Sequence, residues 1–309
     1  EELERHNLFV VPLDDARRSY RLHDLFREVL LARLHATEPA LLPVLHGRAA
    51  RWYAEQGELR EAIPHALVAK DAAKAAALIT RAAPVLWLRG EAATVQGWIE
   101  ALPDAVVLQH ARLALDAALH LLESIHALAK EPYAQGLAPL ERAIARVEGL
   151  IQHQPALPDA EVALIARRIG LLRAQIAARP ILARGDVERM RLLVAEADAL
   201  AEGETVGWKL TALALTFWLV ESLQREGALL LERLAAAKRE AIAAKDQRAT
   251  LRVMRWLAFA YLSAGRLRPL EEESLEALAL LEPLGARSAT TGYFQFFLAD
   301  AYYALNRLP

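Results

Sequence analysis

The apolar and polar positions after Tyr20 show no alternation of the kind that a strand produces. Apolar residues instead share single faces of amphipathic helices, as Leu25, Phe26 and Val29 do near the start of the chain. Ala, Leu, Arg and Glu dominate the sequence, and this mixture favours helix. The bulk of the chain is therefore predicted to be all-α.

Self-similarity becomes visible after Pro155. The stretches LAFAYLSAGRLRP (Leu257–Pro269) and LADAYYALNRLP (Leu298–Pro309) match in Leu, Ala, Ala, Tyr, Arg and Leu at a constant offset of 41 residues. Each pattern is typical of the end of one helix, a tight turn and the start of a partner helix. Gly265 and Asn306 occupy the turn, and these residue types best tolerate the left-handed conformation that ends a helix.

The same turn is predicted twice more, at Gly185 and Gly227, so that successive turns are 42, 38 and 41 residues apart. Two helices per unit of about forty residues predict an α-solenoid. We expect a right-handed α-α superhelix that is similar to tetratricopeptide repeats but has longer helices. An irregular helical bundle is the alternative.

The register of the first helices agrees with this alignment. In tetratricopeptide repeats the seventh, eighth and eleventh positions of the first helix are buried. Every equivalent position here is apolar: Ala177, Ala178, Ile181, Leu219, Val220, Leu223, Leu257, Ala258, Tyr261, Leu298, Ala299 and Tyr302.

Composition excludes several classes of protein. The chain has no cysteine, which rules out disulfides and thiolate metal sites and fits a cytoplasmic protein. Its apolar runs are far shorter than a membrane span, and no signal peptide opens it. A net charge of −2 gives no global basic field for nucleic acid. Because the opening EELERHNLF has no initiator Met and the last residues stop where a helix should begin, we expect a piece of a longer protein.

Three motifs resemble the middle of MalT-type regulators: NLFVVPLDDARRSYRLHDLFREVLLARL, WYAEQGELREAIPHALVAKD and WIEALP. This family consists of ATP-dependent transcriptional activators of the signal-transduction ATPase (STAND) class, which end in a LuxR-type DNA-binding domain. The resemblance covers residues 3 to about 115 and continues to Pro309 only as an architecture of two-helix repeats. It implies an ATPase module, a winged helix, a superhelical sensor and a helix-turn-helix in the full-length protein.

On this resemblance residues 1–36 are the C-terminal part of the winged helix, a small remnant of that domain. Residues 37–130 are a helical linker with irregular first repeats, and residues 131–309 are the sensor. No G-x-x-x-x-G-K-[ST] motif and no basic helix-turn-helix occur in the sequence. We therefore expect no enzyme, no nucleic-acid binding and no cofactor in this chain. ATP or ADP and self-association are implied for the full-length protein.

Residues 8–13 and 19–23 flank a polar turn like the two strands of a wing, and Asp24 is expected to cap the helix that follows. Leu22, His23 and Asp24 match the place of the Met-His-Asp motif of STAND proteins. The resemblance implies that His23 contacts the β-phosphate of ADP, a task that suits imidazole. The alternative is a strand-end histidine that bonds to local backbone.

One spacing suggests a metal site. His120, Glu123 and His126 form H-x-x-E-x-x-H, and steps of three keep them within about a third of the helix circumference. The zincin pattern instead places two histidines four residues apart, and no second cluster supplies further ligands. A partly exposed polar face is favoured, and no metal is expected.

Two functions remain open. The first is an inducer-sensing domain that binds a small molecule and relieves autoinhibition of a transcriptional activator. The second is a solenoid that docks a regulatory protein. A deep groove with clustered aromatic residues favours the small molecule, and a shallow charged groove favours the protein.

The inner wall of the superhelix is the place where we expect an effector. The second, fifth, ninth and twelfth positions of each first tetratricopeptide helix face the concave surface. Rings beside Arg, Glu and Gln side chains suit a sugar or an aromatic metabolite. The alternative is that Phe217, Phe259 and Phe296 only pack helices together. The predicted effector residues are Gln175, Arg179, Phe217, Glu221, Gln224, Arg252, Arg255, Phe259, Tyr293, Phe296, Asp300 and Tyr303.

Overall fold

The computed structural model describes residues 10–12, 20–126, 130–153, 157–223, 227–284 and 289–306. The chain divides into two compact units, Glu1–Leu78 and Ile79–Pro309. This division differs from the expected domain boundaries after residues 36 and 130, which stay predictions.

The first unit opens with an antiparallel two-stranded ribbon, as predicted for the strands of a wing. Val10 pairs with Leu22, and Pro12 pairs with Tyr20. Helices joined by short turns make up the rest of the described part of this unit. The elements are β1 (Val10–Pro12), β2 (Tyr20–Leu22), α2 (Asp24–Thr37), α3 (Leu41–Glu55), α4 (Leu59–Val68) and the start of α5 (Ala72–Leu88).

The beginning of α2 differs from the expectation that Asp24 caps it. His23 occupies the N-cap position, and its side chain makes no capping hydrogen bond. Asp24 is the first helical residue. A carboxylate in the first turn stabilises a helix through the macrodipole rather than as a cap, and the same sequence pattern permits both.

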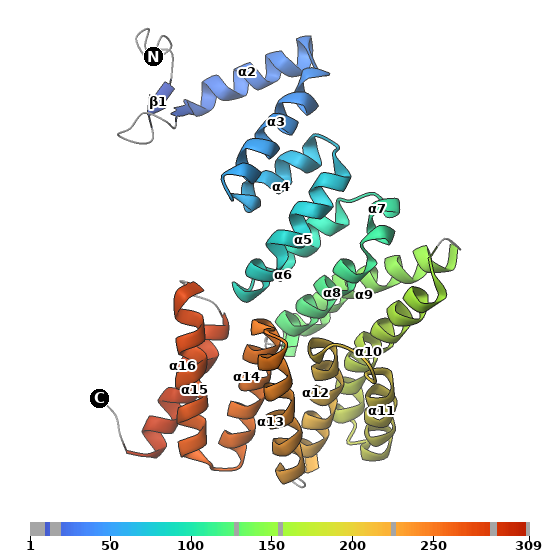
Figure 1. Cartoon of the computed structure of the whole chain (residues 1–309), viewed down its shortest axis with the longest axis vertical. Helices are drawn as coiled ribbons and strands as arrows, with labels where there is room; N and C mark the ends of the chain where they lie inside the picture. Colours follow the sequence, from blue (N-terminus) through green and yellow to red (C-terminus); the bar gives the residue numbers. More distant parts are fainter. Residues whose placement is uncertain are drawn as a thin grey trace. The chain divides into compact units, whose positions relative to one another are not determined.

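The second unit is an all-α helical solenoid (Figure 1). Among its described helices none combines the length and the apolarity that crossing a bilayer requires. After α5 its elements are α6 (Ala92–Glu100), α7 (Asp104–Gln109), α8 (Ala111–His126), α9 (Lys130–His153), α10 (Asp159–Ala183), α11 (Val187–Leu200), α12 (Val206–Leu223), α13 (Gly227–Ala243), α14 (Gln247–Ser263), α15 (Leu267–Leu281), the 3₁₀ turn Glu282–Leu284 and α16 (Ala289–Ala304).

The first helices of the repeats form one layer of this unit, and the second helices form another. The first helices α8, α10, α12, α14 and α16 each pack on the next first helix, and we call them the inner layer. The second helices α11, α13 and α15 each pack between two first helices.

The first helices α10, α12, α14 and α16 begin at residues 159, 206, 247 and 289, which are 47, 41 and 42 residues apart. The predicted two-helix repeat of about forty residues is thus confirmed.

Left-handed residues end the first helices, as predicted for Gly185 (φ 68°), Gly265 (φ 66°) and Asn306 (φ 54°). After Gly265, the N–H of Arg266 bonds to the carbonyl of Tyr261 at 2.8 Å, which is the pattern of a Schellman cap. The prediction for Gly227 is wrong, because this residue starts α13 without a left-handed φ. Glycine is also accepted at the start of a helix, so its identity alone did not decide the position.

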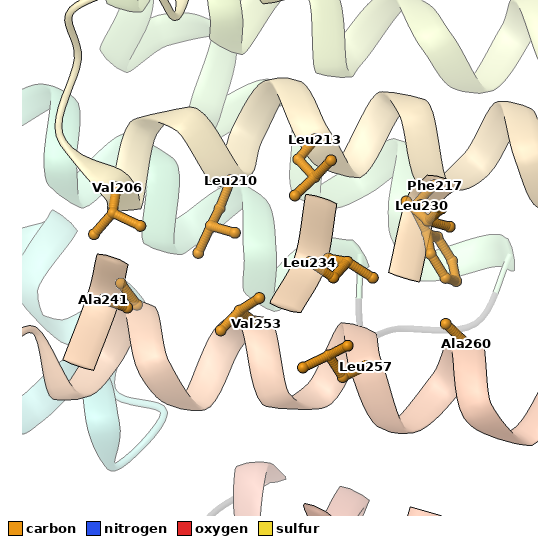
Figure 2. Close-up of a cluster of buried hydrophobic side chains, with 11 residues drawn as sticks. Val206, Leu210, Leu213, Phe217, Leu230, Leu234, Ala241, Val253, Leu257 and Ala260 are labelled. Carbon is orange, nitrogen blue, oxygen red and sulfur yellow. The ribbon is translucent and has the colours of Figure 1, made fainter. Parts of the chain in front are cut away.

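Hydrophobic side chains of three consecutive helices form one core cluster (Figure 2). The helix α12 contributes Leu210 and Phe217, α13 contributes Leu234, and α14 contributes Val253 and Leu257. All of these side chains are nearly or fully buried. The cluster packs the second helix α13 against the first helix of its own repeat, α12, and against the first helix of the next repeat, α14. This packing sets the distance between successive helices of the inner layer.

The burial of the aligned register positions follows the prediction at Ala178, Leu219, Leu257 and Ala258, all of which are buried. The side chain of Leu223 lies outside the described residues. Ala299 is exposed, so the prediction is wrong there. No described helix packs on the far side of α16, and a register position is buried only where a following repeat covers it.

Two leucines of α13 test the core. Leu234 is 1% exposed and Leu229 is 59% exposed. The substitution Leu234→Ala is expected to lower the free energy of unfolding by about 2–5 kcal/mol, because it leaves a cavity between three helices. The control Leu229→Ala is expected to cost less than about 1 kcal/mol. Urea titration followed by helical circular dichroism measures both, and equal losses would contradict the assignment of the core.

Candidate functional site

The inner layer of the second unit surrounds a cavity of about 470 Å³, which we call the apolar cavity. Its wall comes from α8, α10, α12, α14 and α16, so that every first helix of the repeats takes part. Aromatic side chains dominate the lining. They are Phe217, Trp218, Trp256, Phe259, Tyr293 and Phe297.

Several of these rings touch in series. The centroid of Phe217 lies 4.6 Å from that of Trp256 and 5.3 Å from that of Phe259, which in turn lies 6.3 Å from Phe297. Phe217 is 3% exposed and belongs to the core, whereas Phe259 is 42% exposed. Phe259 therefore presents part of its ring to solvent, while the buried Phe217 packs edge-on against it.

Arg255 joins this aromatic wall. Its guanidinium carbon lies 5.6 Å from the ring centroid of Trp256 and 5.4 Å from that of Tyr293. Contacts at these distances are cation–π interactions. They hold the guanidinium beside the cavity without neutralising its charge.

Seven of the twelve predicted effector residues line the apolar cavity. They are Gln175, Arg179, Phe217, Arg252, Arg255, Phe259 and Tyr293. Gln175 is 2% exposed, and its amide donates a hydrogen bond to the backbone carbonyl of Thr211, so it also links α10 to α12.

Three of the other five predicted residues are described, and they lie outside the lining of this cavity. Phe296 and Tyr303 on α16 are 61% and 72% exposed, and with Asp300 they stand outside the lining. The side chain of Glu221 and the whole of Gln224 lie outside the described residues.

A second cavity of about 270 Å³, which we call the polar cavity, adjoins the first. The two share Leu119, Glu123, Arg252 and Arg255 in their linings. Charged side chains dominate the wall of the polar cavity, in contrast to the aromatic wall of its neighbour.

Side chains of α8 and α14 meet between the two cavities. The Nε of Arg252 lies 2.5 Å from Oε1 of Glu123, and Arg252 also donates to the carbonyl of Gly207 at 2.7 Å. Arg248 bonds to Nε2 of His120 at 2.6 Å. We call the four side chains His120, Glu123, Arg248 and Arg252 the α8–α14 clasp.

The hydrogen-bond roles of His120 follow from its partners. A guanidinium only donates, so Nε2 accepts from Arg248. The proton then sits on Nδ1, which donates to Oε2 of Glu123 at 3.1 Å. The imidazole also lies against the ring of Trp87, with centroids 4.3 Å apart.

Glu123 is ionised in this setting. Burial alone would raise the pKa of Glu123, but attraction by Arg252, with smaller contributions from His120 and Arg255, outweighs it and holds the pKa far below the ordinary 4.5. Its oxygens are engaged by Arg252 and His120. The side chain of His126 is outside the described residues, and among those described no three metal-binding side chains cluster.

Sequence reasoning missed the wall that α5 and α8 contribute, including Trp87 and Leu119, because nothing in the repeat alignment extends that far forward. It also missed Arg248. A signal for Arg248 existed, since it lies four residues before Arg252 and seven before Arg255 and so shares their face of the helix.

His23 lies in the first unit, at the exposed start of α2. The chain contains no Gly-rich phosphate-binding motif. A role of His23 toward ADP stays a prediction.

Comparison with known proteins gives two findings. The family model described as the MalT winged helix domain matches residues 1–42, which supports a MalT-type regulator and does not describe an enzyme. The chain is also 32% identical over 174 residues to the serine/threonine-protein kinase PknK of two strains of Mycobacterium tuberculosis and of Mycobacterium bovis. This match covers 56% of the chain but only 15% of the length of those proteins.

The clasp generates a prediction about pH. The substitution Glu123→Gln removes the countercharge of Arg252 and is expected to lower the free energy of unfolding at pH 7 by about 3 kcal/mol. Because the folded pKa of Glu123 is depressed, its stabilisation is present above the unfolded pKa near 4.5 and is lost as the pH falls below it. The difference between parent and variant should shrink as the pH is lowered from about 6 to about 3.

Chemical denaturation at a series of pH values measures this difference. Glu240→Gln is the control, because Glu240 forms an exposed ion pair with Lys209. That variant is expected to change stability by less than about 1 kcal/mol at every pH. A constant difference for Glu123→Gln across the range would contradict the pairing.

Proposed function

We propose that this chain is the effector-sensing part of an ATP-dependent transcriptional activator, and that a small molecule bound in the apolar cavity relieves autoinhibition. The regulatory setting rests on the winged-helix match and on the MalT-like motifs of the first unit. No kinase activity is proposed for this chain, since the likeness to PknK covers a small part of that protein. A regulator of this kind acts in the cytoplasm.

The observation that carries the proposal is the convergence of one side-chain stripe on one cavity. Phe217 on α12, Arg255 and Phe259 on α14 and Tyr293 on α16 all belong to the predicted concave register, and all line the same volume. A volume of about 470 Å³ falls in the range of small-molecule sites. Rings with a few convergent polar groups are the usual composition of such sites.

A small molecule fits this geometry better than a docked protein does. A docking solenoid presents an open, extended surface with alternating charged groups. The apolar cavity is instead walled by five helices, and its exposed aromatic face at Phe259 is a local feature.

A thermal-shift screen of the chain against sugars, aromatic compounds and other metabolites identifies the effector, since a ligand specific for the folded state raises the melting temperature. The variants Phe259→Ala and Arg255→Ala are expected to abolish the shift while leaving helical circular dichroism unchanged.

Phe296→Ala is the matched comparison, because Phe296 is aromatic, lies on the predicted stripe and is outside the cavity. If Phe296→Ala keeps the full ligand-induced rise in melting temperature, the effector site is confined to the apolar cavity. An unchanged shift in both Phe259→Ala and Arg255→Ala would show the proposal to be wrong.

A second experiment concerns the nucleotide state of the full-length protein. His23→Ala is expected to raise basal transcription and to weaken ADP retention, because the resemblance assigns this imidazole to the β-phosphate. Reporter activity without inducer and the ADP content of the purified protein measure the effect. The control is His35→Ala, which changes an exposed histidine of the same helix. If neither quantity changes for His23→Ala, His23 has no nucleotide role.

A further inference from the structure

Three arginines follow one face of α14. Arg248, Arg252 and Arg255 are four and three residues apart, so they project from the same side of the helix over about two turns. All three line the polar cavity, and Arg252 and Arg255 line the apolar cavity as well. A row of guanidinium groups thus runs from one cavity into the other.

The lining of the polar cavity is rich in charged side chains. It contains the five arginines Arg112, Arg168, Arg248, Arg252 and Arg255 and the three acids Asp116, Glu123 and Asp246.

Three of the five arginines have acidic partners. Arg112 pairs with Glu161, Arg168 with Glu204 at 3.1 Å, and Arg252 with Glu123.

The other two arginines are held by rings. The guanidinium of Arg248 lies 4.5 Å from the ring centroid of Trp87, and that of Arg255 lies over Trp256 and Tyr293. Within the described part of the chain neither forms an ion pair with a carboxylate. Aromatic faces orient a guanidinium and leave its N–H groups available for an anion.

Unused donors occur beside these arginines. The indole Nε1 atoms of Trp87 and Trp256 are shielded from solvent and have no hydrogen-bond acceptor among the described residues. Trp87 lines the polar cavity and Trp256 the apolar cavity. Each cavity therefore has one indole N–H of its lining without an acceptor.

This arrangement discriminates between ligands. A neutral molecule that fills the apolar cavity strips water from Arg255 and leaves a charge without a partner, which is unfavourable. An anionic group at the same place supplies both the countercharge and the missing acceptors, and a guanidinium binds carboxylate or phosphate through charge-assisted hydrogen bonds.

We infer that the effector is an organic anion whose apolar or aromatic body lies in the apolar cavity against Phe259 and whose carboxylate or phosphate group bonds to Arg255 at the junction with the polar cavity. Arg248, a member of the clasp, supplies a second positive charge in the polar cavity. The inference rests on the proposed function, because it names the chemical class of ligand for the same cavity.

Matched probes test the anionic group. Naphthalene-2-carboxylate, 2-naphthyl phosphate and the neutral 2-naphthylmethanol share one aromatic body and differ in the head group. Titration calorimetry of the chain with each probe is expected to give a dissociation constant at least about tenfold lower for one of the anions than for the alcohol. The tighter of the two anions identifies the head group.

Variants locate the contact. Arg255→Gln keeps hydrogen-bond donors but removes the charge, and it is expected to abolish the preference for the anion while binding of the alcohol is retained. Arg268→Gln, which changes an exposed arginine of α15, is the matched control and should keep the full preference. Raising the salt concentration should weaken the anion more than the alcohol.

The outcomes separate this inference from the proposed function. Equal affinity for anion and alcohol, with both affinities reduced in Phe259→Ala, overturns the inference and leaves the cavity as an effector site. A preference for the anion that survives in Arg255→Gln also overturns it. Binding of none of the three probes, together with a thermal shift by a neutral metabolite that depends on Phe259, overturns the inference alone. A ligand whose binding is unaffected by Phe259→Ala and Arg255→Ala overturns both.

Discussion

The ion pair between Glu123 and Arg252 is the constraint on which the inner surface of the second unit depends. In a simple solenoid each repeat contacts only its neighbours. The helices α8 and α14 are separated in the inner layer by α10 and α12, and yet their side chains bond directly. A partly buried charge pair tolerates little displacement, since loss of either partner leaves the other uncompensated. The clasp therefore fixes how strongly the inner layer curves.

The two cavities adjoin the clasp. The clasp passes between them, so Glu123 and Arg252 belong to both walls. The repeats contribute aromatic rings to the apolar cavity and charged side chains to the polar cavity. Arg255 lies at the boundary and contacts Trp256 and Tyr293. Apolar contact and electrostatic orientation are thus available within one continuous region.

Local signals in the sequence are sufficient for the repeat and for part of the site. The turns at Gly185 and Gly265 are predictable because a left-handed residue is a property of a few neighbouring positions. Phe259 and Arg255 are predictable as concave because helical periodicity sets the face on which they lie. Gly227 shows the limit of this reasoning, since glycine suits both a turn and a helix start.

Long-range contacts are beyond such reasoning. Nothing near Glu123 indicates that its partner lies on α14, because the pairing depends on the summed rotation of the repeats between them. The spacing of His120 and Glu123 predicts a partly exposed polar face, and it does not indicate that both side chains bond to arginines of α14. Periodicity also does not indicate how far along α16 the cavity extends, since Tyr293 belongs to its lining and Phe296 does not.

The clasp also bears on how the chain folds. His120 and Arg248 are 128 residues apart in sequence, whereas most other contacts of the solenoid join adjacent helices. Closing so long a loop has a high entropic cost until the helices in between have formed. The repeats can assemble locally and fast, and the clasp closes only after them. During synthesis α8 is therefore complete long before its partner emerges, and the cavities are the last part of the unit to take shape.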